Sequence, residues 1–344
     1  MQKYQRIPET AECPVCGAGA ALRLWSTTSS QAAQNFVLRE KHPDRFLELA
    51  SHIECLWGQS VCHVVQCERC GFCYSSPYVA GDERFYDLAY DRRGYPKWKW
   101  EFQRTYDALK ERCRPDQSLL EIGAGDGAFV ARIADDILPK ENIVCTEFSK
   151  YGRDEIEKLG VKCLSEDVRD LPGAQWEDSF DVVCLFQVLE HMDRLKVLFQ
   201  KLTRMMKSSG SLFIAVPNPK RIEFNELNGA LLDMPPNHIG RWNRRCFEEV
   251  GAQNGLRIEG YRVEEESRAS IARQFVVYRY LRKSQEGRSL ENRIERIGNR
   301  YLLGAMRMIG VALGSVGAVP ALVKSPPGIG DSQWVHLIKG CSIP

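Results

Sequence analysis

The middle of the chain alternates between two hydrophobic patterns, one typical of buried strands and one typical of amphipathic helices. The run Asp181–Phe186 is almost wholly apolar, as expected for a strand that is buried on both faces. Leu195, Leu198 and Leu202 then recur at the spacing of one helix face, and Gly210 is expected to end that helix. The alternation predicts a doubly wound parallel sheet. The predicted strands are 118–122, 142–147, 161–164, 181–186 and 211–216, and the predicted helices are 98–113, 129–137, 153–159 and 195–205.

The pattern loosens after residue 217, where turns and a short helix near Phe247 and Val250 replace the regular alternation. Leu256–Val263 and Trp334–Lys339 alternate like two further strands, and a mostly helical insertion separates them. These changes in the hydrophobic pattern along the chain predict an α/β fold in four parts. The parts are a small knuckle-bearing module with an inserted segment over 1–90, a core over 91–265, a helical insertion or cap over 266–330, and a last core strand with a tail over 331–344.

Composition narrows the class of protein. Of 344 residues, 44% are hydrophobic and 27% are charged, which excludes a disordered or low-complexity chain. Lys and Arg number 47 against 45 Asp and Glu, and this near-neutral charge disfavours nucleic acid as a partner. The first residues hold no apolar run behind a basic start, so we expect no secretory signal and a cytoplasmic location.

Two Cys-x-x-Cys knuckles stand out among 13 cysteines, and a glycine follows each of them. The pairs Cys13/Cys16 and Cys67/Cys70 supply four thiolates, which suffice for a tetrahedral, structural zinc ion. The 50 residues between the pairs indicate an inserted segment. The alternative is a set of reduced core cysteines or a redox pair. Core positions, rather than metal ligands, are the favoured interpretation for Cys55, Cys62, His63 and Cys73.

A glycine-rich turn follows the first predicted strand of the core and carries Gly123, Gly125 and Gly127. Such a turn is typical of nucleotide-derived cofactor sites, including dinucleotide sites. Glu121 ends the strand and Asp126 lies in the turn. Because carboxylates repel a pyrophosphate and attract an ammonium or a sulfonium, the charge favours S-adenosylmethionine over a dinucleotide.

Acidic residues also follow the next two strands. Glu147 lies 22 positions after Gly125, at the distance where a carboxylate binds ribose hydroxyls. Asp167, beside the backbone of Val168, is placed to meet an adenine amino group. Gln187 follows the fourth strand at the same predicted edge, and we expect it to line the cofactor site as well.

The segments LLEIGAGDG, EFS, EDV and FDVVCLFQVLEHMDRLKVLFQKLTRMMKSSGSLFIAVPNP resemble the class I S-adenosylmethionine-dependent methyltransferases over about residues 118 to 265. The resemblance implies a Rossmann-like sheet of seven strands, with the two late strands as its closing antiparallel hairpin. The knuckles, CGFCYSSP and PPNHIGRW are similar to a bacterial subgroup that includes sugar methyltransferases of polysaccharide and antibiotic pathways. A small sugar-containing acceptor, such as a sugar nucleotide or a lipid-linked sugar, and O-methylation rather than C- or N-methylation are therefore expected.

Two histidines are candidate general bases for such a reaction. His191 follows the fourth strand, and His238 lies on a proline-rich loop with Trp242 as an expected apolar wall of the pocket. His191 and Glu190 equally suit the capping or bracing of the next helix, and a divalent metal at that pair is a weaker alternative. For His238, a structural loop histidine remains the alternative. Tyr95 and Trp98 are possible covers of the cofactor, although a core role is favoured for both.

The helical insertion is basic and then apolar. Residues 262–307 carry eleven Arg or Lys against six Glu, and the following uncharged stretch is shorter than the roughly 20 residues of a membrane span. Packing on the sheet or a dimer contact is favoured here over contact with an anionic membrane. Two rival functions stay open, namely an RNA or protein methyltransferase and a binding module with a vestigial cofactor pocket.

Overall fold

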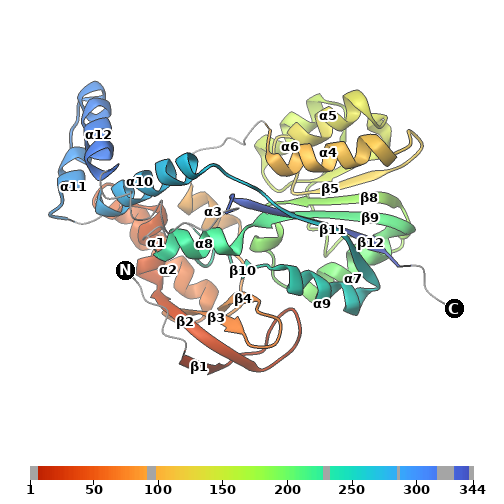
Figure 1. The fold of residues 1–344 in the computed structure, drawn as a ribbon, viewed down its shortest axis with the longest axis horizontal. Coiled ribbons are helices and arrows are strands. Elements are labelled where there is room, and N and C mark those ends of the chain that lie inside the picture. The colour runs from red at the N-terminus through yellow and green to blue at the C-terminus, as the bar shows by residue number, and fades with distance from the viewer. Residues whose placement is uncertain (1–6, 91–97, 228–232, 285–286, 316–328, 341–344) are drawn as a thin grey trace.

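A computed structural model describes residues 7–90, 98–227, 233–284, 287–315 and 329–340, and it contains two sheets (Figure 1). The larger sheet has seven strands in the order β11-β12-β9-β8-β5-β6-β7. The five strands from β9 to β7 in this order are parallel to one another. β12 is antiparallel to β9, and β11 is antiparallel to β12. The expected seven-stranded Rossmann-like sheet with a closing hairpin is thus confirmed. The strands are β5 (Leu119–Ile122), β6 (Ile143–Thr146), β7 (Lys162–Leu164), β8 (Phe180–Phe186), β9 (Met206–Pro217), β11 (Leu256–Val263) and β12 (Ser332–Lys339).

Helices cover both faces of this sheet, which makes it doubly wound (Figure 1). Successive side chains of β5 face opposite sides of the sheet, so Leu119 packs with one helical layer and Leu120 packs with the other. The first layer contains α4 (Trp100–Arg112), α5 (Ala128–Asp136) and α6 (Lys150–Lys158), and the second contains α7 (Leu195–Met205) and α9 (Arg244–Asn254). Short 3₁₀ turns, η1 (Lys140–Asn142) and η2 (Leu189–His191), complete the connections.

The junction between α7 and β9 differs from the prediction. The helix ends at Met205 and the strand begins at Met206, so Gly210 lies inside the strand. A Cβ atom at Gly210 would lie 2.9 Å from the carbonyl oxygen of Lys207. Glycine is therefore needed for a close backbone approach rather than for ending the helix.

The N-terminal module forms a second sheet of five strands in the order β1-β2-β3-β4-β10. The segment between the cysteine knuckles is an ordered insertion that runs through a strand, two helices and another strand. The last strand of the sheet, β10 (Gly240–Arg241), comes from the core segment between β9 and β11, and it pairs with β4. The core therefore contributes one strand to the sheet of the module. Its elements are β1 (Ile7–Thr10), β2 (Ala20–Thr28), α1 (Ser29–Phe36), α2 (Pro43–Trp57), β3 (Val61–Cys67), β4 (Cys73–Ser76) and α3 (Glu83–Ala89).

Trp242 lies directly after β10, and its position differs from the expected wall of a substrate pocket. The side chain is fully buried, with ring centroids 5.0 Å from Phe72 of the module and 5.2 Å from Phe247 of α9. Trp242 therefore packs between the module and the core, where its large apolar surface stabilises the contact.

The described part of the segment between β11 and β12 is mostly helical, as expected. It contains α10 (Arg268–Ser284), α11 (Leu290–Glu295) and α12 (Arg300–Ser315), while α8 (Pro219–Leu227) follows β9. Buried Arg221 of α8 lies 3.4 Å from Glu266 and 3.1 Å from Asp331, and these contacts hold the start of the insertion against the sheet. Among the described residues, no helix has both the length and the apolar character of a membrane-spanning segment.

Candidate active site and metal centre

The glycine turn between β5 and α5 has a backbone that requires its glycines. Gly123, Gly125 and Gly127 all have positive φ, with values of 68°, 61° and 80°. A Cβ atom on Gly123 would come within 2.5 Å of a methyl carbon of Val188. The turn is anchored to the next strand, because the N–H of Gly123 donates to the carbonyl oxygen of Thr146 at 2.9 Å. The turn is thus tightly packed between two strand ends.

Glu147 binds this turn directly. The N–H of Gly125 donates to Oε2 of Glu147 at 2.9 Å, and the N–H of Ser149 donates to Oε1 at 2.7 Å. Each carboxylate oxygen still has a lone pair for a further donor, such as a ribose hydroxyl. The predicted contact of Glu147 with ribose hydroxyls stays a prediction.

Glu121 is a buried carboxyl group without a partner for one of its oxygens. Its side chain is 2% exposed, and Oε2 accepts no hydrogen bond among the described residues. Burial raises the pKa of Glu121 well above its usual value, Lys99 opposes this rise, and Glu147 and Asp126 add to it. A cationic ligand beside Glu121 would favour its ionised form. The expected contact of Glu121 with a cationic cofactor stays a prediction.

Asp167, Val168 and Gln187 have other neighbours. Arg169 donates through Nε to both carboxylate oxygens of Asp167, at 2.9 and 3.0 Å, and the side chain of Val168 is buried in the core. Gln187, which has a φ of 57°, donates through Nε2 to Glu101 Oε1 and to Ser332 Oγ, both at 3.0 Å. Their contacts with a cofactor stay predictions.

Sequence reasoning did not select Lys99 or Glu101, which reach the site from the start of α4. Glu101 is 2% exposed and binds Gln187, and Lys99 is near enough to Glu121 to affect the pKa of that carboxyl group. The available signal was a glutamate on the predicted helix 98–113 next to apolar residues. Such a position suggests burial, but only the tertiary packing of α4 on the sheet identifies its partner.

His191 lies at the end of η2 in the neutral form. Its Nδ1 is 2.7 Å from the carbonyl oxygen of Asn237, and a carbonyl oxygen only accepts, so Nδ1 carries the proton. Nε2 of the neutral ring is therefore an acceptor. Burial, together with the nearby charge of His238, lowers the pKa of His191 to about 3. Arg194 is the N-cap of α7, so neither His191 nor Glu190 caps that helix, and their bracing of it stays an alternative.

His238 stacks edge-on against His191, with ring centroids 4.7 Å apart. Its Nδ1 lies 2.7 Å from Oδ1 of Asp233. Burial opposes protonation of His238, but the ion pair with Asp233 is stronger and raises its pKa above the usual value. The same pair lowers the pKa of Asp233 against the effect of burial. The arrangement orients the ring and leaves Nε2 as the nitrogen available to a substrate.

Glu190 completes this cluster. It is 1% exposed, and neither carboxylate oxygen accepts a hydrogen bond within the described part of the chain. Burial raises its pKa to about 7, although the charge of His238 opposes the rise. Glu190, His191 and His238 each bring one ligand atom within 4.8 Å of the others, a spacing that also suits a metal ion. The two histidines selected from the sequence are thus brought together.

Of the two aromatic residues considered as covers of the cofactor, only Trp98 lies among the described residues. Trp98 is partly exposed, its Nε1 donates to Gln103, and its ring meets Phe102 edge-on. Its contacts are therefore with its own helical layer. Tyr95 lies outside the described residues.

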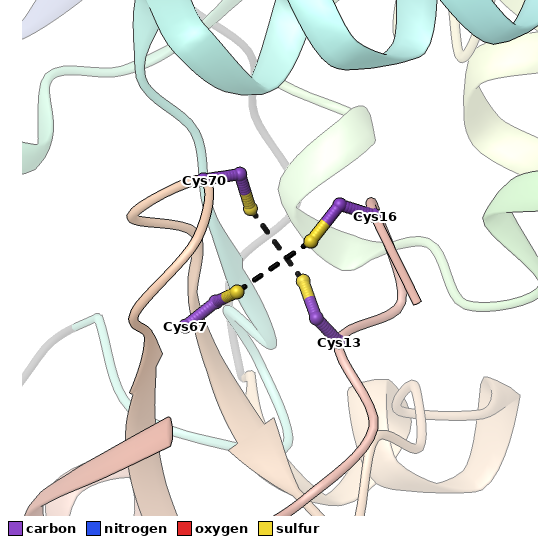
Figure 2. A group of neighbouring side chains, drawn as sticks. All are labelled: Cys13, Cys16, Cys67 and Cys70. Carbon is purple, nitrogen blue, oxygen red and sulfur yellow. Dashed lines mark hydrogen bonds between the residues drawn. The ribbon is translucent and has the colours of Figure 1, made fainter. Parts of the chain in front are cut away.

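The four knuckle cysteines converge on one point, as Figure 2 shows. Sγ of Cys13 lies 3.6 Å from Sγ of Cys70, and Sγ of Cys16 lies 3.5 Å from Sγ of Cys67. Four sulfurs bound tetrahedrally to zinc at about 2.3 Å lie about 3.8 Å from one another. The spacing and the thiol chemistry of the cluster therefore fit a closed zinc site. The glycine after each knuckle has positive φ, and its N–H donates to the carbonyl oxygen of the first cysteine.

The other cysteines do not join this cluster. Cys62 and Cys73 pack in a separate hydrophobic core, and His63 binds Ser26 Oγ at 2.7 Å. Cys55 is exposed. Sequence reasoning did not select Cys246, whose Sγ lies 3.9 Å from the carbonyl oxygen of Cys70. Only the packing of α9 against the second knuckle reveals that position.

Residues 120–214 match the family described as a methyltransferase domain. The seven-stranded sheet and the glycine turn that surround this match are those expected for a class I S-adenosylmethionine-dependent methyltransferase.

Among similar proteins is a Mycobacterium tuberculosis protein named "Probable S-adenosylmethionine-dependent methyltransferase". The two are 32% identical over 134 residues, which cover 37% of this chain and 44% of that protein. The mitochondrial ubiquinone biosynthesis O-methyltransferase of Dictyostelium discoideum is 26% identical over 102 residues, covering 30% and 31%. The chain therefore spans less than half the length of these relatives.

A crystal structure of an S-adenosylmethionine-dependent methyltransferase from Archaeoglobus fulgidus resembles this chain with a TM-score of 0.43 and 16% identity. The alignment covers 69% of this chain and 90% of that chain. The strand order of the sheet, rather than this superposition, defines the fold described above.

Proposed function

We propose that this protein transfers the methyl group of S-adenosylmethionine to a hydroxyl group of a small, sugar-containing metabolite. The observation that carries the proposal is the glycine turn held by Glu147 beside buried Glu121, within the segment that matches the methyltransferase domain. This turn lies at the carboxyl ends of parallel strands, where ligands bind in open α/β sheets. Sugar nucleotides and lipid-linked sugars are the acceptors to examine first.

The cofactor supplies an activated methyl group, so the chain mainly binds and orients the reactants. Glu121 would attract the positive charge of the methyl donor. The free lone pairs of Glu147 would accept hydrogen bonds from the ribose hydroxyls. Asp167, Val168 and Gln187 are proposed as further contacts at the same strand ends.

His238 is the stronger candidate base, and Asp233 is its positioning residue. The acceptor oxygen would attack the methyl carbon in line, the carbon–sulfur bond would break, and the sulfonium would become a neutral thioether. The hydroxyl proton would pass to Nε2 of His238, and Asp233 would stabilise the resulting imidazolium through Nδ1. His191, whose pKa is lowered by burial, would remain neutral and accept a hydrogen bond through Nε2. A metal held by Glu190 and the two histidines is the alternative use of this cluster.

Cys13, Cys16, Cys67 and Cys70 are proposed to hold one structural zinc ion. Four thiolates fill the coordination sphere and leave no position for substrate, so this zinc would stabilise the N-terminal module instead of taking part in catalysis. A reducing compartment such as the cytoplasm would keep the thiols available, and we propose that location.

Incubation with methyl-labelled S-adenosylmethionine and a panel of sugar nucleotides tests the proposed reaction. Transfer of label to a sugar hydroxyl is expected, and His238→Ala should lower turnover with little effect on cofactor affinity. Label on RNA or protein instead would favour the second function, and salt-sensitive retention on heparin would accompany an RNA substrate. Absence of cofactor binding would indicate a vestigial pocket.

A further inference from the structure

The helical insertion presents an apolar surface that none of the described residues covers. Tyr301, Leu302, Met308, Ile309 and Leu313 of α12 are between 51% and 82% exposed. The other four residues lie one, seven, eight and twelve positions after Tyr301, so the set shares one face of the helix over three turns. We define this set as the outer face of α12. Contiguous apolar faces of this kind mark sites of interaction.

The opposite face of α12 is the one that packs on the protein. Gly310 is buried, and a Cβ atom there would lie 2.6 Å from the ring of Tyr280 on α10 and 3.3 Å from Ile294 on α11. Val311 packs on Phe275 and Val276 of α10. The helix is thus held by its inner face, and the expected packing of an apolar helix on the large sheet is not observed. α11 and α12 lie at one end of the molecule, away from the seven-stranded sheet (Figure 1).

Exposed basic side chains lie in the same part of the helical insertion, on α11, at the start of α12 and in the segments that precede them. Arg288, Arg293, Arg296 and Arg300 are exposed, and none of them has a carboxylate partner among the described residues. The two acidic residues of the described stretch 287–315 are engaged elsewhere, since Glu291 lies 3.5 Å from Lys283 and Glu295 binds Arg307. The stretch therefore combines an apolar helix face with unneutralised positive charge.

We propose that the outer face of α12 docks on the surface of an anionic lipid membrane. Exposed leucine, isoleucine, methionine and tyrosine side chains would enter the boundary between headgroups and acyl chains, while the arginines would contact lipid phosphates. The stretch 287–315 carries five Arg against two Glu, so a second copy of this chain would bring like charge to it, whereas an anionic surface complements that charge. This inference does not depend on the methyl-transfer reaction. It would place the enzyme where lipid-linked acceptors are found.

Flotation of the whole protein with vesicles tests this proposal. Vesicles of phosphatidylcholine and phosphatidylglycerol should bind the protein, and binding should fall with salt, whereas phosphatidylcholine alone should bind much less. The double variant Met308→Glu/Ile309→Glu should weaken binding about tenfold or more. Val197→Glu, at an exposed apolar position on α7, is the matched control and should leave binding unchanged.

The double variant should keep the circular dichroism spectrum and S-adenosylmethionine affinity of the wild type, so a loss of binding reports on the face itself. Equal flotation of the double variant and the wild type would overturn the proposal. So would a dimer in sedimentation equilibrium that Met308→Glu/Ile309→Glu converts to a monomer while anionic vesicles bind neither form.

Discussion

At the scale of single residues, the cluster at the strand ends is organised by what each polar atom can donate or accept. The carbonyl oxygen of Asn237 fixes the proton of His191 on Nδ1, and Asp233 does the same for His238. Burial and these partners then separate the two histidines, because the pKa of His191 is lowered to about 3 and that of His238 is raised. Two neighbouring histidines therefore have different chemistry.

The substitution Asp233→Asn tests this separation. Loss of the negative charge should lower the pKa of His238, because burial then acts without the ion pair that opposes it. An NMR titration of the imidazole Cε1–H resonance measures the change directly. The resonance of His336, on β12, should titrate as in the wild type. An unchanged titration of His238 in Asp233→Asn would contradict the proposed role of the pair.

The raised pKa of His238 also makes the stability of the fold depend on pH. Because the folded-state pKa of His238 is raised, the ion pair stabilises the fold fully below the ordinary histidine pKa, and this contribution is lost as pH rises through the raised value. The free energy of unfolding of the wild type should therefore exceed that of Asp233→Asn, and the difference should be larger at about pH 6 than at about pH 9. The first pH lies below the ordinary histidine pKa of about 6.5, and the second lies well above it. Urea unfolding at the two pH values measures the difference.

At the scale of elements, the glycine turn between β5 and α5 combines an unusual backbone with close packing. Gly123→Ala would place a Cβ atom 2.5 Å from Val188 at a φ of 68°. Gly255→Ala is the matched control, since Gly255 has a φ of 66° and no atom within 4 Å of its would-be Cβ. The control should lose about 1 kcal/mol from backbone strain, and Gly123→Ala should lose about 1–3 kcal/mol more from overpacking.

Thermal unfolding and cofactor titration of both variants check this expectation. Gly123→Ala should also lose cofactor affinity, because Val188 or the turn must move. Equal melting temperatures for the two alanine variants would show that the collision is relieved without loss, and the description of the turn as tightly packed would then be wrong.

The four-cysteine cluster belongs to the same scale, because it joins the two ends of an inserted segment. Purified protein should contain about one equivalent of zinc, and Cys67→Ser should lower both metal content and melting temperature. Cys55→Ser, at an exposed cysteine outside the cluster, should change neither. A second equivalent of metal that is retained in Cys67→Ser and lost in His238→Ala would assign the Glu190 cluster to metal binding instead. A metal-free protein with unchanged stability would contradict the zinc proposal.

At the scale of the whole molecule, hydrophobic periodicity predicted the large sheet because its strands and helices alternate in chain order. Periodicity could not predict β10, a strand of two residues that pairs with β4 more than 160 positions away in the chain. The burial of Trp242 follows from that pairing, and the buried partners Lys99 and Glu101 follow from the docking of α4. The exposure of α12 also depends on tertiary packing, because an apolar stretch by itself is equally typical of a core helix.

The most direct test of the account is a calorimetric titration of the whole protein with S-adenosylmethionine and, separately, with NAD. The account predicts saturable binding of S-adenosylmethionine and none of NAD. Glu147→Gln should weaken the binding about tenfold or more, because the amide has fewer acceptor lone pairs for the turn and the ribose. Glu141→Gln, at an exposed glutamate of η1, should bind as the wild type does. Binding of NAD without binding of S-adenosylmethionine would contradict the central claim.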